Sequence, residues 1–89
     1  MSEDMKGETK DLFNTIAEIT DAKVIRELFE DLCTYKEIDA MAQRLYAAKL
    51  LKEGKTYEQV IEKTDISSAT LSRVSKCLKF GEGYKKVLK

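Results

Sequence analysis

The sequence predicts an all-α fold of six helices, and two observations lead to that prediction. Apolar residues recur at helical spacing along the whole chain, and no segment alternates with period two over the length of a strand. The 89 residues include no Pro and only four Gly, which suits long helices joined by short turns. A chain this short has a marginal core, and dimerisation is a common remedy.

The first two helices follow from apolar spacing and one cap. Apolar residues at i, i+1, i+4 and i+7 predict a helix over about residues 7–19. Thr20 or Asp21 can then accept free backbone N–H groups at the start of a second helix, whose apolar face runs to Leu32.

A longer third helix is predicted from near Tyr35 to about Glu53. Thr34 lies just before the first turn of this helix and Glu37 lies within it. The two residues have the spacing of a capping box. Four alanines and several larger apolar residues give this helix a wide apolar band, which other helices should surround. Gly54 is placed to end it in the left-handed conformation.

The rest of the chain predicts shorter helices. Thr56 and Gln59 have a second capping-box spacing, at the start of a helix of about eight residues. A polar turn follows, and Ser67 or Ser68 can cap the next helix, over about residues 68–79. The sequence "FGEGY" ends that helix, and "YKKVLK" is long enough only for a short terminal helix.

The net charge is zero, but the charges are unevenly spread. Residues 1–53 carry eight basic and twelve acidic side chains, a net −4, while residues 54–89 carry eight and four, a net +4. Chance clustering in a short chain is one explanation. The other is that the basic part faces a polyanion such as DNA.

Composition excludes several kinds of chemistry. Without His, nucleophilic catalysis of the Ser–His or Cys–His type is excluded, and a zinc site is not expected. The carboxylates of the first helices have no basic or nucleophilic partner spaced to make an active site, so we expect no enzyme. Cys33 and Cys77 are expected to be free thiols in or near the core. The sequence shows neither a membrane span nor a signal-peptide core, so we expect a cytoplasmic protein.

Residues 54–79 have the plan of a helix-turn-helix: a short helix, a turn of about four residues and a second helix that starts with small polar residues. The apolar positions spaced to form the core between the two helices are Val60, Ile66, Leu71 and Val74. The second helix of such a unit enters a groove about 12 Å wide, so small side chains at its start favour DNA contact.

The outer face of the second helix is therefore a candidate DNA-binding surface. Its hydroxyls and N-terminal backbone N–H groups can bond phosphate oxygens. The residues predicted to face DNA are Ser67, Ser68, Ala69, Thr70, Ser72, Arg73 and Lys76. Each has a plainer explanation as a helix cap or a solvated side chain, and only their combined spacing favours DNA.

The segments "LCTYKEIDAMAQRL", "LLKEGKTYEQV" and "ATLSRV", within residues 32–78, resemble the Trp repressor superfamily, above all its small TrpR-related branch of YerC/YecD type. The length of the chain predicts a single domain, and the resemblance implies that it forms an intertwined homodimer. Residues 1–53 and the short C-terminal helix of residues 80–89 would build its core, and residues 54–79 would project as DNA-reading heads. Gln59 matches an outward residue of the first short helix and joins the predicted DNA-binding set. The implied function is a sequence-specific transcription regulator, a repressor, which reads the major groove of double-stranded DNA.

The same resemblance implies an effector pocket. Thr34, Arg44 and Arg73 match residues that hold tryptophan in Trp repressors. Val74 stands where those repressors have a Gly that admits the indole ring, and Cys77 stands where they have a Ser that receives the ligand's ammonium group. Tryptophan is therefore not expected to bind, and whether another amino acid acts as corepressor stays open. A Val side chain that occupies part of the pocket would hold the DNA-reading head in position without a ligand.

A second hypothesis belongs to another class. The helix-turn-helix shape could serve a protein–protein interaction module that binds its partner through the acidic helices of residues 1–53. In that case the loss of Arg73 or Ser72 would leave function intact, whereas a DNA-binding regulator would lose affinity or specificity.

Overall fold

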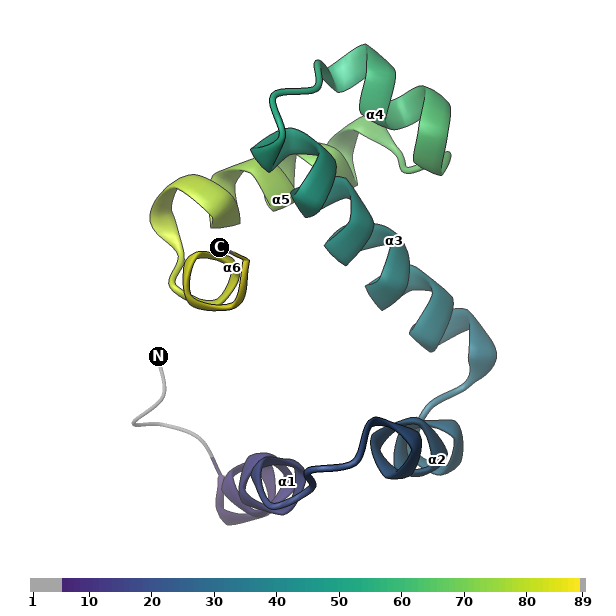
Figure 1. Cartoon of the computed structure of the whole chain (residues 1–89), viewed down its shortest axis with the longest axis vertical. Helices are drawn as coiled ribbons and strands as arrows, with labels where there is room; N and C mark the ends of the chain where they lie inside the picture. The colour runs from purple at the N-terminus through teal and green to yellow at the C-terminus, as the bar shows by residue number, and fades with distance from the viewer. Residues whose placement is uncertain (1–5, 89) are drawn as a thin grey trace. The chain divides into compact units, whose positions relative to one another are not determined.

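The described part of the chain consists of six helices (Figure 1). The computed structural model describes residues 6–88 and contains no strand within that range. The helices are α1 Gly7–Ala17, α2 Ala22–Leu32, α3 Tyr35–Lys52, α4 Tyr57–Thr64, α5 Ser68–Phe80 and α6 Gly83–Val87. The predicted all-α fold class is confirmed. The chain divides into two compact units between Tyr35 and Lys36.

The first unit holds α1 and α2, neither of which contains a buried residue. α1 ends at Ala17, slightly before the predicted end, because the Ile19 N–H donates to the Ile16 carbonyl in a tighter i→i−3 turn at 3.1 Å. Asp21 caps α2 and accepts the Lys23 backbone N–H at 2.9 Å. Of the two caps predicted here, Asp21 is therefore the one used.

α3 begins at Tyr35 as predicted and ends in a Schellman motif. Gly54 takes a φ of +98°, which confirms its predicted left-handed conformation. The Lys55 N–H donates to the Leu50 carbonyl at 3.1 Å, and the Gly54 N–H donates to the Leu51 carbonyl at 3.0 Å. Both bonds satisfy carbonyl groups that the end of the helix leaves open, and they direct the chain toward α4.

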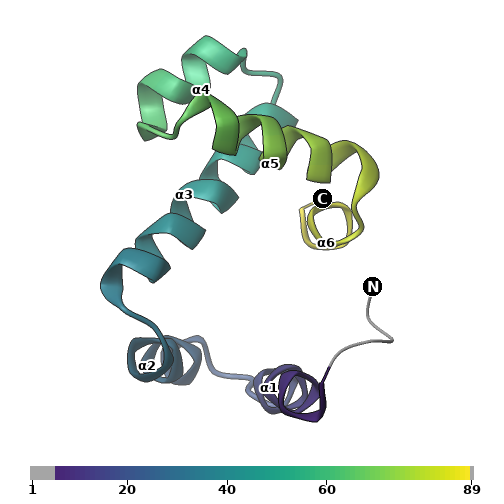
Figure 2. The ribbon, with the colours of Figure 1, turned by 180° about the vertical axis from the view of Figure 1, so that it is seen from behind.

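The core of the second unit lies where α4 and α5 pack on the C-terminal end of α3, an arrangement that Figures 1 and 2 show from opposite sides. Its buried apolar side chains are Ala47, Ala48, Leu50, Val60, Ile66, Leu71, Val74 and Leu88. The small side chains of Ala47 and Ala48 allow the neighbouring helices to approach α3 closely. The chain that leaves α6 returns Leu88 to this core, so the short terminal helix is anchored at its end.

The apolar band of α3 is covered mainly near its C-terminal end. Ala47, Ala48 and Leu50 are buried, whereas Leu45 and Tyr46 are 39% and 47% exposed. The helices of the second unit therefore cover only part of the band that the sequence predicted to be surrounded by helices.

Two expectations from composition can be compared with the structure. Cys33 and Cys77 are both free and half-buried, and neither belongs to the buried core cluster. Within residues 6–88, none of the helices combines the length and the apolar character needed to span a lipid bilayer.

Candidate nucleic-acid interface

α4, a short turn and α5 form a helix-turn-helix on the end of α3 (Figure 1). The turn consists of residues 65–67, because the preceding Thr64 is still helical. Val60 and Leu71 are completely buried, while Ile66 and Val74 are 4% and 1% exposed. The predicted core between the two helices is confirmed, and it holds α5 by a single apolar face.

Thr64 fixes the geometry of the turn, although it was not among the residues predicted to matter. Its side chain is buried, and its hydroxyl donates to the Val60 carbonyl at 2.7 Å and accepts the Ile66 N–H at 3.2 Å. The next residue, Asp65, has a φ of +59°, a left-handed conformation that Asp tolerates better than most residues. A Thr before an Asp at the end of a helix is the signal that the sequence carries for this arrangement.

The start of α4 is closed by the predicted capping box. The Gln59 N–H donates to Thr56 Oγ1 at 3.2 Å, and the Thr56 N–H donates to Gln59 Oε1 at 2.9 Å. The box uses one lone pair of the Gln59 carbonyl oxygen and leaves the second lone pair and the amide N–H groups available. The contact of Gln59 with DNA stays a prediction.

The start of α5 is capped by Ser67, one of the two residues predicted for this role. Ser67 Oγ accepts the Thr70 backbone N–H at 3.1 Å and donates to Thr70 Oγ1 at 2.9 Å. Thr70 is half-buried, and the exposed Ser68 is the first helical residue. Ser67 and Thr70 are thus engaged with each other, and the Thr70 O–H remains a donor for another group.

Five of the predicted DNA-facing residues form the exposed outer face of α5: Ser68, Ala69, Ser72, Arg73 and Lys76. Their spacing of three or four residues places them on neighbouring turns of the helix. The side chains in the first turn are small, and α5 contains three basic residues and no acidic residue.

Arg73 and Lys76 are not engaged in ion pairs within the described residues. By contrast, Arg26 Nε on α2 forms an ion pair with Glu30 Oε2 at 3.2 Å. Arg73 and Lys76 are therefore open to an anionic partner. An internal salt bridge of Arg73, the plainer explanation of its charge, is not present in the second unit.

The residues predicted to hold an effector lie in different surroundings. Val74 belongs to the core, Arg73 lies on the outer face of α5, and Arg44 and Cys77 are half-buried. Thr34 is exposed and belongs to the first unit. An apolar hollow of about 440 Å³ lies next to Cys77, and its lining consists of Leu45, Cys77, Gly81, Gly83, Tyr84 and Val87.

Comparisons with known proteins give a consistent result. A family model described as Trp repressor protein matches residues 8–89. The uncharacterized protein YerC of Bacillus subtilis (strain 168) is 44% identical over 78 residues, which cover 86% of this chain and 75% of YerC. The crystal structure of a TrpR-like protein from Eubacterium eligens matches with a TM-score of 0.89 and 38% identity, over 98% of this chain and 91% of that chain. A crystal structure from Staphylococcus aureus gives a TM-score of 0.88 and 36% identity, over 99% and 91% of the two chains.

Proposed function

The chain belongs to the Trp repressor protein family, and we propose that it is a sequence-specific DNA-binding transcription regulator. In this proposal the protein is a cytoplasmic homodimer that acts as a repressor rather than as an enzyme. Residues 1–53 and 80–89 build the shared core, residues 54–79 form the two heads, and α5 of each protomer enters the major groove.

The observation that carries the proposal is the division of α5 into two faces. Leu71 and Val74 are buried on one face, and the other face presents small or basic side chains with no carboxylate on the same helix. Buried residues attach the helix firmly to the domain, while its exposed start is slim enough for the groove and rich in hydrogen-bond donors.

The composition of this face also indicates how DNA would be read. Serines make few two-point base contacts, so water-mediated contacts and DNA shape should carry much of the specificity. In this proposal Arg73 and Lys76 contact phosphates. Because the protein has no net charge, we expect weak non-specific binding and a large share of sequence-specific binding.

The test is selection of bound sequences from random duplex DNA with the purified full chain, over a series of salt concentrations. A two-fold symmetric enriched sequence is the expected result for a dimer with two reading heads. If no sequence were enriched at any salt concentration, the proposal would be overturned and the protein–protein interaction module would be favoured.

Variants of α5 test the assigned surface once a binding sequence is known. Arg73→Ala should weaken binding about tenfold on all sequences and reduce the slope of log affinity against log salt by about one. Ser72→Ala should instead relax the preference at one position of the site. Lys86→Ala on α6 removes an exposed cation outside the helix-turn-helix and should change neither quantity. Equal effects of Arg73→Ala and Lys86→Ala would show that α5 is not the reading helix.

A further inference from the structure

A second hollow, of about 430 Å³, adjoins the helix-turn-helix. It is formed by the end of α3, the start of α4, one flank of α5 and α6. Its lining consists of Leu51, Lys52, Lys55, Tyr57, Ser75, Leu78, Lys79, Tyr84 and Lys85. Leu51, Leu78 and Tyr84 pack against the core and form an apolar floor. We call this site the lysine hollow.

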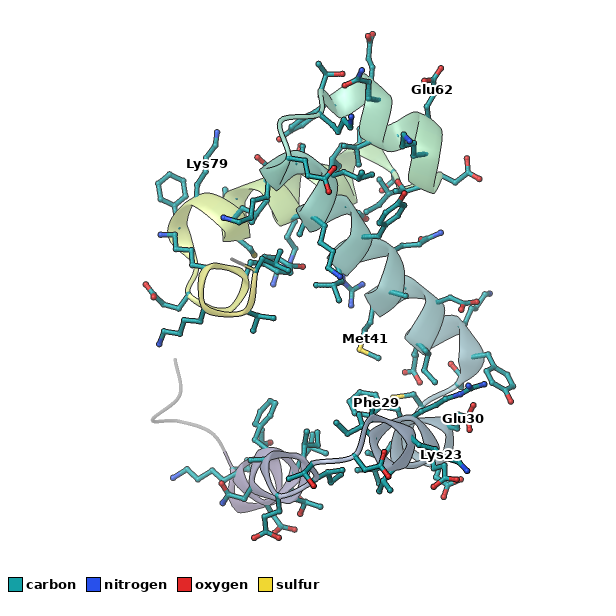
Figure 3. The ribbon with its side chains drawn as sticks, in the orientation of Figure 1. Lys23, Phe29, Glu30, Met41, Glu62 and Lys79 are labelled. Carbon is teal, nitrogen blue, oxygen red and sulfur yellow. The ribbon has the colours of Figure 1, made fainter. Side chains whose placement is uncertain are left out.

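Four exposed lysines surround the floor: Lys52, Lys55, Lys79 and Lys85. Figure 3 shows Lys79 projecting outward from the C-terminal part of α5. No acidic side chain lines the hollow, and none of the four ammonium groups forms an ion pair within the described residues. Four like charges around one hollow repel each other, and an anion placed between them would relieve that repulsion.

The neighbouring hollows differ from this one in charge. One, lined by Lys49, Lys52, Glu53, Val87 and Leu88, contains a carboxylate of its own. The apolar hollow beside Cys77 contains no charged side chain. Among these three, the lysine hollow combines an apolar floor with a purely basic rim, and it shares no residue with the predicted effector set.

We propose that the lysine hollow binds a small organic anion. An aromatic body would lie on Leu51, Leu78 and Tyr84, and a carboxylate or phosphate group would lie among the lysines, with the Ser75 hydroxyl as a further donor. The volume falls within the range of about 300–1,000 Å³ found for small-molecule sites, which are mostly apolar with few polar groups. A DNA backbone needs only exposed cations, and it would leave the apolar floor without a role. This proposal does not depend on DNA binding.

The test uses a pair of fluorescent probes that differ in charge. The probe 1-anilinonaphthalene-8-sulfonate is an aromatic anion, and N-phenyl-1-naphthylamine has the same rings without the sulfonate. The full chain should bind the anion more tightly than the neutral probe. Both 1-naphthoate and 1-naphthyl phosphate should be tried as competitors, because they separate a carboxylate ligand from a phosphate ligand. Displacement by neither would overturn the proposal, and so would equally strong displacement by inorganic phosphate, which has no apolar body.

A charge-matched pair of variants locates the binding site. The double variant Lys55→Gln, Lys79→Gln should bind the anionic probe about five- to tenfold more weakly and the neutral probe unchanged. The control Lys10→Gln, Lys23→Gln removes two exposed lysines that do not line the hollow and should leave both affinities as they were. Equal anion affinity in the two double variants would overturn the proposal. If Lys55 and Lys79 affected only DNA affinity, the lysines would be phosphate contacts and the proposal would be wrong.

Discussion

Val74 shows how one side chain determines what the helix-turn-helix can accommodate. It is 1% exposed and packs in the same core cluster as Val60 and Leu71. By the resemblance to Trp repressors, this is the position at which a Gly leaves room for the indole ring. We propose that the methyl groups of Val74 take up that volume in this chain, because protein interiors do not yield space without a cost in packing. In this proposal the side chain of Val74 holds the DNA-reading head in position without a ligand.

This packing predicts that tryptophan does not stabilise the protein. Millimolar tryptophan should leave the midpoint of thermal or urea denaturation within error of the value with millimolar glycine, an amino acid without the ring. A ligand at 100 times its Kd would add about 2.7 kcal/mol to the free energy of unfolding. A rise of that size with tryptophan alone would contradict the filled pocket.

At the scale of the helix, the ends of α3, α4 and α5 are each defined by a few local bonds. The end of α5 depends on Gly81, whose N–H donates to the Cys77 carbonyl at 2.8 Å. A Cβ at this position would lie 2.7 Å from the same carbonyl oxygen. By contrast, a Cβ at Gly83 would meet nothing within 4 Å. Two neighbouring glycines of the same connection therefore differ in whether a side chain fits.

The different surroundings of Gly81 and Gly83 predict different effects of an Ala substitution at the two positions. Gly81→Ala should lower the free energy of unfolding by about 1–3 kcal/mol, because the backbone must shift to remove the clash. Gly83→Ala should be neutral or raise it by up to about 1 kcal/mol, because Ala favours the helical conformation at the start of α6. Urea denaturation of both variants measures this. If Gly81→Ala were as stable as Gly83→Ala, the close contact with Cys77 would not exist in solution.

For the whole molecule, the main feature is the amount of apolar surface that a single chain leaves uncovered. Phe13, Val24 and Leu32 in the first unit are 55%, 44% and 54% exposed. Large exposed apolar side chains mark an interface where they gather into one patch. Together with the partly covered band of α3, these side chains support the proposed homodimer, in which a second copy would supply the missing half of the core.

A dimer of this kind predicts that stability depends on protein concentration. The denaturation midpoint should rise with concentration, since unfolding of an obligate dimer also separates its subunits. Phe13→Glu should lower the dimer fraction in analytical ultracentrifugation, because it buries a charge in the interface. Asn14→Glu, which adds the same charge at the neighbouring exposed position on α1, is the control. A midpoint independent of concentration and a monomer mass for the unaltered chain would contradict the dimer.

The sequence by itself determined the helices and most of their ends. The capping box of Thr56 and Gln59, the cap by Ser67 and the left-handed Gly54 depend on residues within about five positions of each other. Such short-range bonds can be recognised from spacing alone. The four core positions of the helix-turn-helix were predictable for the same reason, because helical periodicity separates the buried face of α5 from its exposed face.

The tertiary structure alone decided which surfaces these helices form together. The rim of the lysine hollow takes its residues from the end of α3, the connection to α4, the end of α5 and α6, and no spacing in the sequence relates Lys52 to Lys85. The two hydrogen bonds of the Thr64 hydroxyl are local, whereas the burial of its side chain depends on the packing of the second unit. The physical reason is that a helix forms from contacts along a few consecutive turns, whereas a pocket forms from the packing of helices far apart in the chain.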